Sequence, residues 1–191
     1  MIFGQLQYVC CRKGVTMNNR IEKTKQSISN AFIDLRSKKS LEKITIKELC
    51  ETAQINKSTF YVYYRDIYDL SDKIEDEIVS EVIRSLDTTG KILENSAELS
   101  KSLFYAYTAQ TSLISVIFSG MRAQQLPKKI EAALREAIFS VYPEYKDDID
   151  FNVRLTYSIY GGFYTYMKYR NSENKAVVDI IGKMSEKLME Q

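Results

Sequence analysis

The stretch that decides the fold is ITIKELCETAQINKSTFYVYYRDIYDL, which runs from Ile44 to Leu70. It opens with Thr45-Ile46-Lys47-Glu48, a spacing typical of a helix N-terminus. In this motif the Thr hydroxyl accepts a hydrogen bond from the third helical N–H and the Glu reaches back to the cap. Apolar residues then recur at the spacing of one buried helix face, at Ile46, Leu49, Cys50 and Ala53. The pattern predicts a short helix that begins after Thr45 and ends near Ala53.

A break over residues 53–55 separates this helix from a second short one, predicted over Lys57–Tyr64. Asn56 is a suitable N-cap for it, and Phe60 and Tyr64 share its inner face. Asp66 is expected to cap a longer helix, and another helix is predicted over residues 20–38. Two short helices joined by a tight turn after a longer helix form the helix-turn-helix plan, in which the second short helix enters the DNA major groove.

The outer side of the second short helix suits contact with DNA. No Asp or Glu occurs from Thr52 to Arg65, where a carboxylate would repel phosphate. Hydroxyl, amide and cationic side chains can bind phosphates and base edges, and Val can contact a thymine methyl group. A plain solvated helix face is the alternative interpretation. The predicted DNA contacts are Thr45, Asn56, Lys57, Ser58, Thr59, Tyr61, Val62, Tyr63 and Arg65.

Over residues 20–70 the chain closely resembles the TetR family of bacterial regulators, and residues 157–170 resemble the penultimate helix of one subgroup of that family. The resemblance implies a homodimer formed by the last two long helices and an effector site between helices of the body. Three positions depart from the family pattern. Gln54 replaces the Gly of the turn, Tyr63 replaces the usual His, and Ile67 replaces a Lys that often anchors phosphate.

The composition excludes several classes of catalytic site. The chain has no His, which removes Ser-His and Cys-His nucleophilic machinery as well as imidazole metal sites. Three cysteines, two of them adjacent at Cys10 and Cys11, give no disulfide framework. The acidic pair Asp147 and Asp148 begins a predicted helix and is interpreted as capping charge. We therefore expect no enzyme, no metal and no cofactor.

Charge and hydropathy favour a cytoplasmic protein. No stretch approaches the roughly 18 consecutive apolar residues of a membrane span. The basic pair Arg12-Lys13 follows the apolar residues of the N-terminus, the reverse of the order in a signal peptide. Residues 1–70 carry 12 Lys and Arg against 7 Asp and Glu, whereas residues 71–191 carry 15 against 18. A basic front suits a segment that meets a polyanion.

Helical periodicity continues through the rest of the chain, and only 7 Gly and 2 Pro interrupt it. The predicted fold is all-α, with a three-helix helix-turn-helix head followed by a larger helical body for regulation and dimerisation. The predicted divisions are an N-terminal extension over 1–18, the head over 19–66 and the body over 67–191. After the helix that Asp66 caps, helices are expected at about 96–109, 112–119, 127–142, 147–170 and 174–190.

The body is rich in aromatic residues, since residues 101–170 hold 14 of the 22 in the chain. They predict either a packed aromatic core or a pocket for an apolar or aromatic effector. The candidate pocket residues are Phe104, Tyr105, Phe118, Met121, Tyr160 and Tyr164. Two adjacent glycines weaken a helix by about 1 kcal/mol each relative to Ala. Contact across a dimer interface could offset this loss, and a kink or a pocket wall are the alternatives. The candidate interface residues are Gly161, Gly162 and Tyr166.

The sequence thus predicts a sequence-specific transcriptional regulator, a ligand-responsive repressor that binds a near-palindromic double-stranded DNA operator as a homodimer. The alternative is a helical protein-interaction module with a degenerate DNA-binding head. Ile67 in place of Lys is the main support for that alternative.

Overall fold

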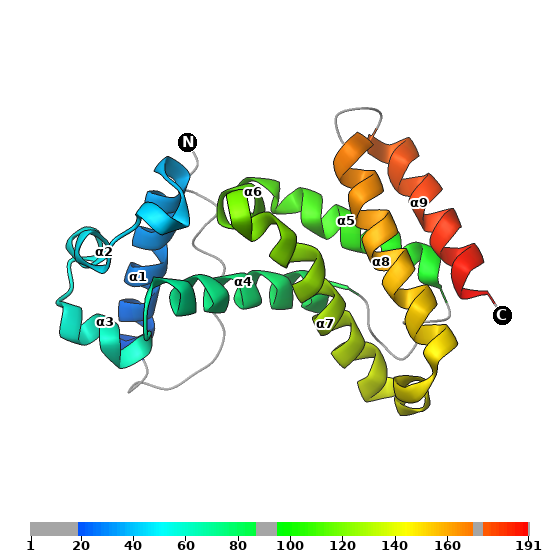
Figure 1. Cartoon of the computed structure of the whole chain (residues 1–191), viewed down its shortest axis with the longest axis horizontal. Coiled ribbons are helices and arrows are strands. Elements are labelled where there is room, and N and C mark those ends of the chain that lie inside the picture. The colour runs from blue at the N-terminus through cyan, green and yellow to red at the C-terminus, as the bar shows by residue number, and fades with distance from the viewer. Residues whose placement is uncertain (1–18, 87–94, 170–173, 191) are drawn as a thin grey trace. The chain divides into compact units, whose positions relative to one another are not determined.

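The computed structural model describes residues 19–86, 95–169 and 174–190 (Figure 1). Every regular element in these ranges is a helix, which confirms the prediction of an all-α chain for this part of the protein. The extension predicted over residues 1–18 lies outside the described residues. None of the helices described has both the length and the hydropathy of a membrane span.

The chain divides into two compact units. The first contains the residues up to Ile78 together with Ser112–Ala123, and the second contains Val79–Thr111 together with the residues from Gln124 onward. The sequence placed a single boundary after residue 66. In the structure the first unit keeps the first two-thirds of a long helix, residues 67–78 of 67–84, and takes in a later segment of the chain.

The first unit is built on the predicted head. Its helices are α1 (Asn19–Lys38), α2 (Ile46–Ala53), α3 (Lys57–Tyr63), the first part of α4 (Ile67–Arg84) and α6 (Thr111–Ile117), which is followed by a 3-10 helix at Gly120–Gln124. Helix α1 packs against α2, and α2 packs against α3. The apolar stripe predicted for α2 is buried at Leu49, Cys50 and Ala53 and half-buried at Ile46. The best buried side chains of the unit include Ile28, Phe32, Leu49, Phe60 and Leu70.

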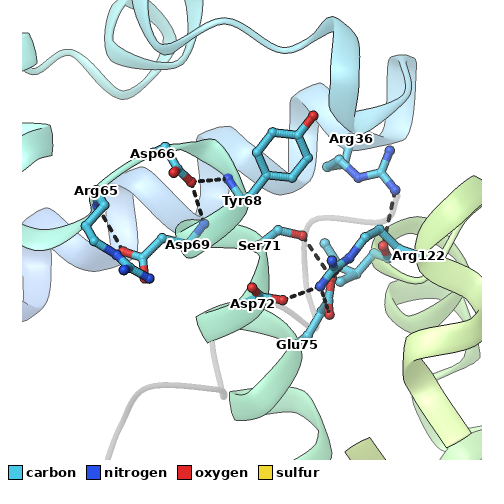
Figure 2. Close-up of polar contacts among 10 residues, drawn as sticks. Arg36, Arg65, Asp66, Tyr68, Asp69, Ser71, Asp72, Glu75 and Arg122 are labelled. Atoms are coloured by element: carbon cyan, nitrogen blue, oxygen red, sulfur yellow. Dashed lines mark hydrogen bonds and ion pairs between the residues drawn. The ribbon is translucent and has the colours of Figure 1, made fainter. Parts of the chain in front are cut away.

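Two arginines hold the later segment in the first unit (Figure 2). Arg36 on α1 donates from Nη2 to the carbonyl oxygen of Ile117 at 3.1 Å and to the hydroxyl of Ser119 at 2.7 Å. Arg122 donates from Nε to Glu75 Oε1 at 2.7 Å and from Nη2 to Glu75 Oε2 at 2.5 Å, and it also pairs with Asp72. Glu75 has no exposed surface. Because a buried carboxylate requires a cation and hydrogen-bond donors, Arg122 ties residues 112–123 to α4.

The second unit contains α5 (Ser96–Ala109), α7 (Gln125–Val141), α8 (Ile149–Tyr169) and α9 (Asn174–Met189), with a 3-10 helix at Pro143–Asp147. Helix α9 packs against both α5 and α8, and α7 packs against α8. Each predicted body helix is present with ends that differ by one or two residues, the usual uncertainty of helix termini.

Two glycines let these helices approach closely. A Cβ atom built on Gly162 would lie 3.2 Å from Ile181 Cγ2 and 3.4 Å from Phe104 Cζ. A Cβ atom on Gly182 would lie 3.2 Å from the backbone oxygen of Ala97. Helix α9 therefore approaches α5 and α8 at positions where only Gly fits without a shift. The mid-helix position of Gly162 is explained by packing within the chain.

Candidate nucleic-acid interface

Helix α2 begins where the sequence predicts. Thr45 has extended backbone angles, and its hydroxyl accepts a hydrogen bond from the backbone N–H of Glu48 at 3.3 Å. The other half of the predicted motif differs, because the Glu48 carboxylate pairs with Lys39 Nζ instead of returning to the cap. Thr45 itself is exposed, so its hydroxyl hydrogen can be donated to a partner in solution.

The turn between α2 and α3 has a left-handed backbone conformation, which Gly usually adopts, at a residue that is not Gly. Gln54 lies in the left-handed region, with φ 56° and ψ 43°. The N–H of Ile55 donates to the carbonyl of Cys50 at 3.0 Å and that of Gln54 donates to Glu51 at 3.3 Å, the paired bonds of a Schellman motif. An L-residue in this region costs about 1–2 kcal/mol. The turn therefore keeps the geometry that the family's Gly would favour, at an energetic cost.

Helix α3 is fixed through its inner face. Phe60 has no exposed surface, Tyr64 is buried, and their ring centroids lie 5.7 Å apart. Tyr61 meets Phe60 edge to face, with centroids 5.5 Å apart. Asn56 occupies the N-cap position but its side chain makes no capping hydrogen bond, which corrects that part of the prediction. The packing of the aromatic residues thus holds α3 in place, without help from its cap.

Lys73 on α4 is a positioning residue that the sequence interpretation missed. Its Nζ donates to the backbone carbonyl of Tyr63 at 2.9 Å, at the C-terminal end of α3. The same Nζ lies 4.9 Å from the centroid of the Tyr64 ring and 3.2 Å from Asp69 Oδ2. The spacing of four residues between Asp69 and Lys73 on one helix was the available signal. Lys73 therefore joins the end of α3 to α4.

The start of α4 is also ordered as predicted (Figure 2). Asp66 Oδ1 accepts hydrogen bonds from the backbone N–H groups of Tyr68 and Asp69, both at 2.8 Å. Asp69 in turn accepts from the backbone N–H of Arg65 at 2.9 Å. This bond, with support from Lys73, lowers the pKa of Asp69 below its usual value. Arg65 keeps an exposed guanidinium group that lies 3.4 Å from Asp69 Oδ1.

Ile67, the position where the family often has a phosphate-binding Lys, is buried as the first residue of α4. Its apolar character is explained by packing in the first unit.

The outward face of α3 carries most of the predicted contacts. A rotation of about 100° per residue puts Ser58 and Val62 roughly opposite Phe60, with Lys57 and Tyr61 beside them. Val62 is 74% exposed and Tyr61 is 56% exposed. Of the nine predicted DNA contacts, Thr59 and Tyr63 are half-buried, and the exposed ones are Thr45, Asn56, Lys57, Ser58, Tyr61, Val62 and Arg65.

The six predicted pocket residues are divided between the two units, with four in the second unit and Phe118 and Met121 in the first. The second unit has a small cavity of about 20 Å³, lined by Leu103, Phe104, Tyr107, Pro127, Ile130, Ile159, Phe163 and Tyr166. Only Phe104 among the six candidates lines it. Phe118 and Met121 belong to the first unit, where Phe118 is buried and Met121 is exposed. Tyr105 and Tyr164 are more than half exposed. Tyr160 is half-buried beside Glu131. Burial, and to a smaller extent its hydrogen bond with Glu131, raises the pKa of Tyr160.

The three candidate interface residues also separate. Tyr166 is 3% exposed, stacks on Phe104 with centroids 4.9 Å apart and shares a hydrogen bond of 2.9 Å with Thr108 Oγ1. It therefore belongs to the core of its own unit, whereas an interface residue must lie at the surface. Gly162 faces α5 and α9 of the same chain, and only Gly161 is exposed.

Comparisons of the chain with family models, with curated proteins and with solved structures gave no match.

Proposed function

We propose that this chain is a sequence-specific DNA-binding transcriptional regulator that inserts α3 into the major groove. The observation that carries the proposal is the outward face of α3. It presents Lys57, Ser58, Tyr61 and Val62 with no acidic residue among them, on a helix whose inner face is fixed by Phe60 and Tyr64. A reading helix needs this combination, because base recognition depends on side chains that are exposed but rigidly placed.

The surrounding groups suit the DNA backbone. Lys57 is exposed and can bind a phosphate or the O6 and N7 atoms of guanine. Arg65 reaches into solvent just beyond α3, and the exposed Tyr61 provides a phenol hydroxyl. The exposed Thr45 hydroxyl begins α2, the helix that crosses the backbone in this motif. Contacts of this kind orient the protein on the duplex, while base contacts give the specificity.

In this proposal the protein acts as a homodimer through α8 and α9. Helix α8 exposes Ile149, Val153 and Tyr157 at four-residue spacing, and α9 exposes Ile180 and Met184. Each set forms an apolar stripe on one side of its helix, and exposure of such a stripe to water is unfavourable. A second copy related by a twofold axis offers the same stripes in return. The two reading helices would then meet half-sites about 34–36 Å apart on a near-palindromic operator.

Regulation by an apolar or aromatic effector is the remaining part of the proposal. The cavity lined by Phe104, Tyr107 and Tyr166 has room for one water-sized molecule, far below the roughly 300 Å³ of a small ligand pocket. An effector must therefore enlarge it. A ligand that binds the enlarged state shifts the population toward that state, and repression is relieved if that state binds the operator less well.

A selection from a random DNA pool, followed by affinity measurements at fixed salt, tests the proposal. The folded chain should prefer a near-palindromic duplex to random duplexes. The double variant Lys57→Ala, Tyr61→Phe should lose affinity, and Lys57→Ala alone should reduce the salt slope by about 1. Lys128→Ala, which removes an exposed lysine of the second unit, is the matched control.

Two results would contradict the proposal. A folded chain with no preference for any duplex is not a sequence-specific regulator. A double variant that binds DNA as well as the parent chain would point instead to an interaction module whose surface does not touch DNA. The dimer is tested separately, since Tyr157→Glu should yield a monomer in sedimentation experiments while Glu144→Gln should not.

A further inference from the structure

The geometry points to Val62 as a specificity-determining residue that reads the 5-methyl group of a thymine in each operator half-site. This inference rests on the proposed function and deepens it. Val62 is 74% exposed, whereas Phe60, two residues earlier on the same helix, has no exposed surface. A β-branched residue is a poor helix former, so helix stability does not account for Val at this position.

The position of Val62 on α3 is central to the outward face. Phe60 marks the inner side, and a rotation of about 200° over two residues turns Val62 away from it. The residue one turn earlier on the same side is Ser58, which is exposed and polar. Lys57 and Tyr61 both lie on one side of this pair. Val62 is thus a single aliphatic side chain among polar ones on the surface that faces the groove.

The chemical groups that each base presents in the major groove indicate which base Val62 can contact. In the major groove guanine and adenine present N7 and their O6 or N6 groups, cytosine presents its N4 amino group, and thymine presents O4 and a C5-methyl group. Thymine is the unmodified base with an aliphatic group on that edge. Any other base would place a polar atom or a gap against Val62 and leave the side chain without a matching surface.

Ser58 narrows the location of this thymine. Four residues along an α-helix span about 6 Å, which is close to two base steps of about 3.4 Å each. The thymine read by Val62 therefore lies within two base pairs of the position contacted by the Ser58 hydroxyl. A hydroxyl can donate or accept, so Ser58 adds little discrimination, and the methyl contact dominates this part of the half-site.

The test replaces thymine by uracil, one position at a time, in the operator obtained by selection. Uracil lacks only the methyl group. We expect one position in each half-site at which the replacement weakens binding by about fourfold, the factor for one buried methyl-sized group. Val62→Ala should bind with lower affinity and lose the sensitivity to uracil at that position. Ser58→Ala, the matched control on the same face, should retain it. Circular dichroism verifies that each variant is folded.

The outcomes separate the two proposals. If the chain selects an operator but no uracil replacement weakens binding, or if Val62→Ala keeps the full sensitivity, then Val62 does not read a thymine methyl group and the proposed function stands. If the folded chain selects no DNA sequence at all, the inference and the proposed function fail together. In a duplex where cytosine replaces that thymine, 5-methylation of the cytosine should restore part of the affinity, and no restoration would overturn the methyl contact.

Discussion

Arg122→Met should destabilise the first unit more than any change at a surface ion pair. Glu75 has no exposed surface, and Arg122, with 16% of its side chain exposed, donates to both of its carboxylate oxygens. Methionine has a similar length but offers no cation and no donor. The Glu75 carboxylate would keep the hydroxyl of Ser71, which donates to Oε1 at 2.9 Å, and would remain buried without its guanidinium partner.

The magnitude follows from the burial of Glu75. Removing one partner of a buried ion pair costs about 3–5 kcal/mol, because the remaining charge stays desolvated. The retained Ser71 bond and the partial exposure of Arg122 place the expected loss at the lower end, near 3 kcal/mol. The exposed pair of Lys38 and Asp34, at 2.7 Å, is the comparison, and Lys38→Met should cost below about 1 kcal/mol.

Urea unfolding followed by circular dichroism at pH 7 measures both losses. The variant Glu75→Met, Arg122→Met removes the two charges together and should recover most of the stability lost by Arg122→Met, since an apolar pair needs no counter-charge. The reasoning is refuted if Arg122→Met costs no more than Lys38→Met, or if the double variant is less stable than Arg122→Met alone.

Three further predictions, which use four substitutions, test other features. Gln54→Gly should stabilise the protein by about 0.5–1 kcal/mol, because Gly removes the left-handed cost but is more flexible when unfolded; a lower melting temperature than the parent would contradict this. Gly182→Ala should destabilise the protein, because its Cβ would approach the backbone oxygen of Ala97. Gly161→Ala, whose Cβ would meet only Tyr157 Cε1 at 3.9 Å, should stabilise the protein by about 1 kcal/mol. Equal effects of the two substitutions on the melting temperature would exclude the packing explanation. Asp69 has a lowered pKa in the folded state, so its stabilisation is present above its unfolded pKa of about 4 and is lost as the pH falls through the folded value. The free energy of unfolding of Asp69→Asn should therefore fall less than that of the parent as the pH drops below about 4. The same pH dependence in both proteins would contradict the role assigned to the hydrogen bonds of Asp69.

Local features of the fold were predictable because they depend on residues a few positions apart. The apolar period of α2, the Thr45 cap and the Asp66 cap all follow from spacings of one to four residues, and the structure contains each of them. The burial of Phe60 and Tyr64 on one face of α3 follows from the same helical period. These signals also located the exposed face on which the candidate interface depends.

Other features depend on residues far apart in the chain and left no local pattern. Arg122 and Glu75 are 47 residues apart, so neither sequence neighbourhood indicates the pair. The lining of the cavity depends on which side of α5, α7 and α8 each aromatic ring faces. The number of aromatic residues in a segment does not indicate the direction of their side chains. For this reason the sequence does not indicate that Tyr166 lies in the core, or that Met121 is exposed.

The discontinuous first unit has a consequence for how the protein is made. The ribosome releases Glu75 well before Arg122, which follows it by 47 positions, a length that takes roughly 2–9 s to synthesise at about 5–20 residues per second. During that time the Glu75 carboxylate can accept from the hydroxyl of Ser71 but lacks the guanidinium group of Arg122. A nascent chain arrested shortly after residue 78 should expose its α4 carboxylates to solvent and to protease. The first unit is therefore completed only after residues 79–111, which belong to the second unit, have been synthesised.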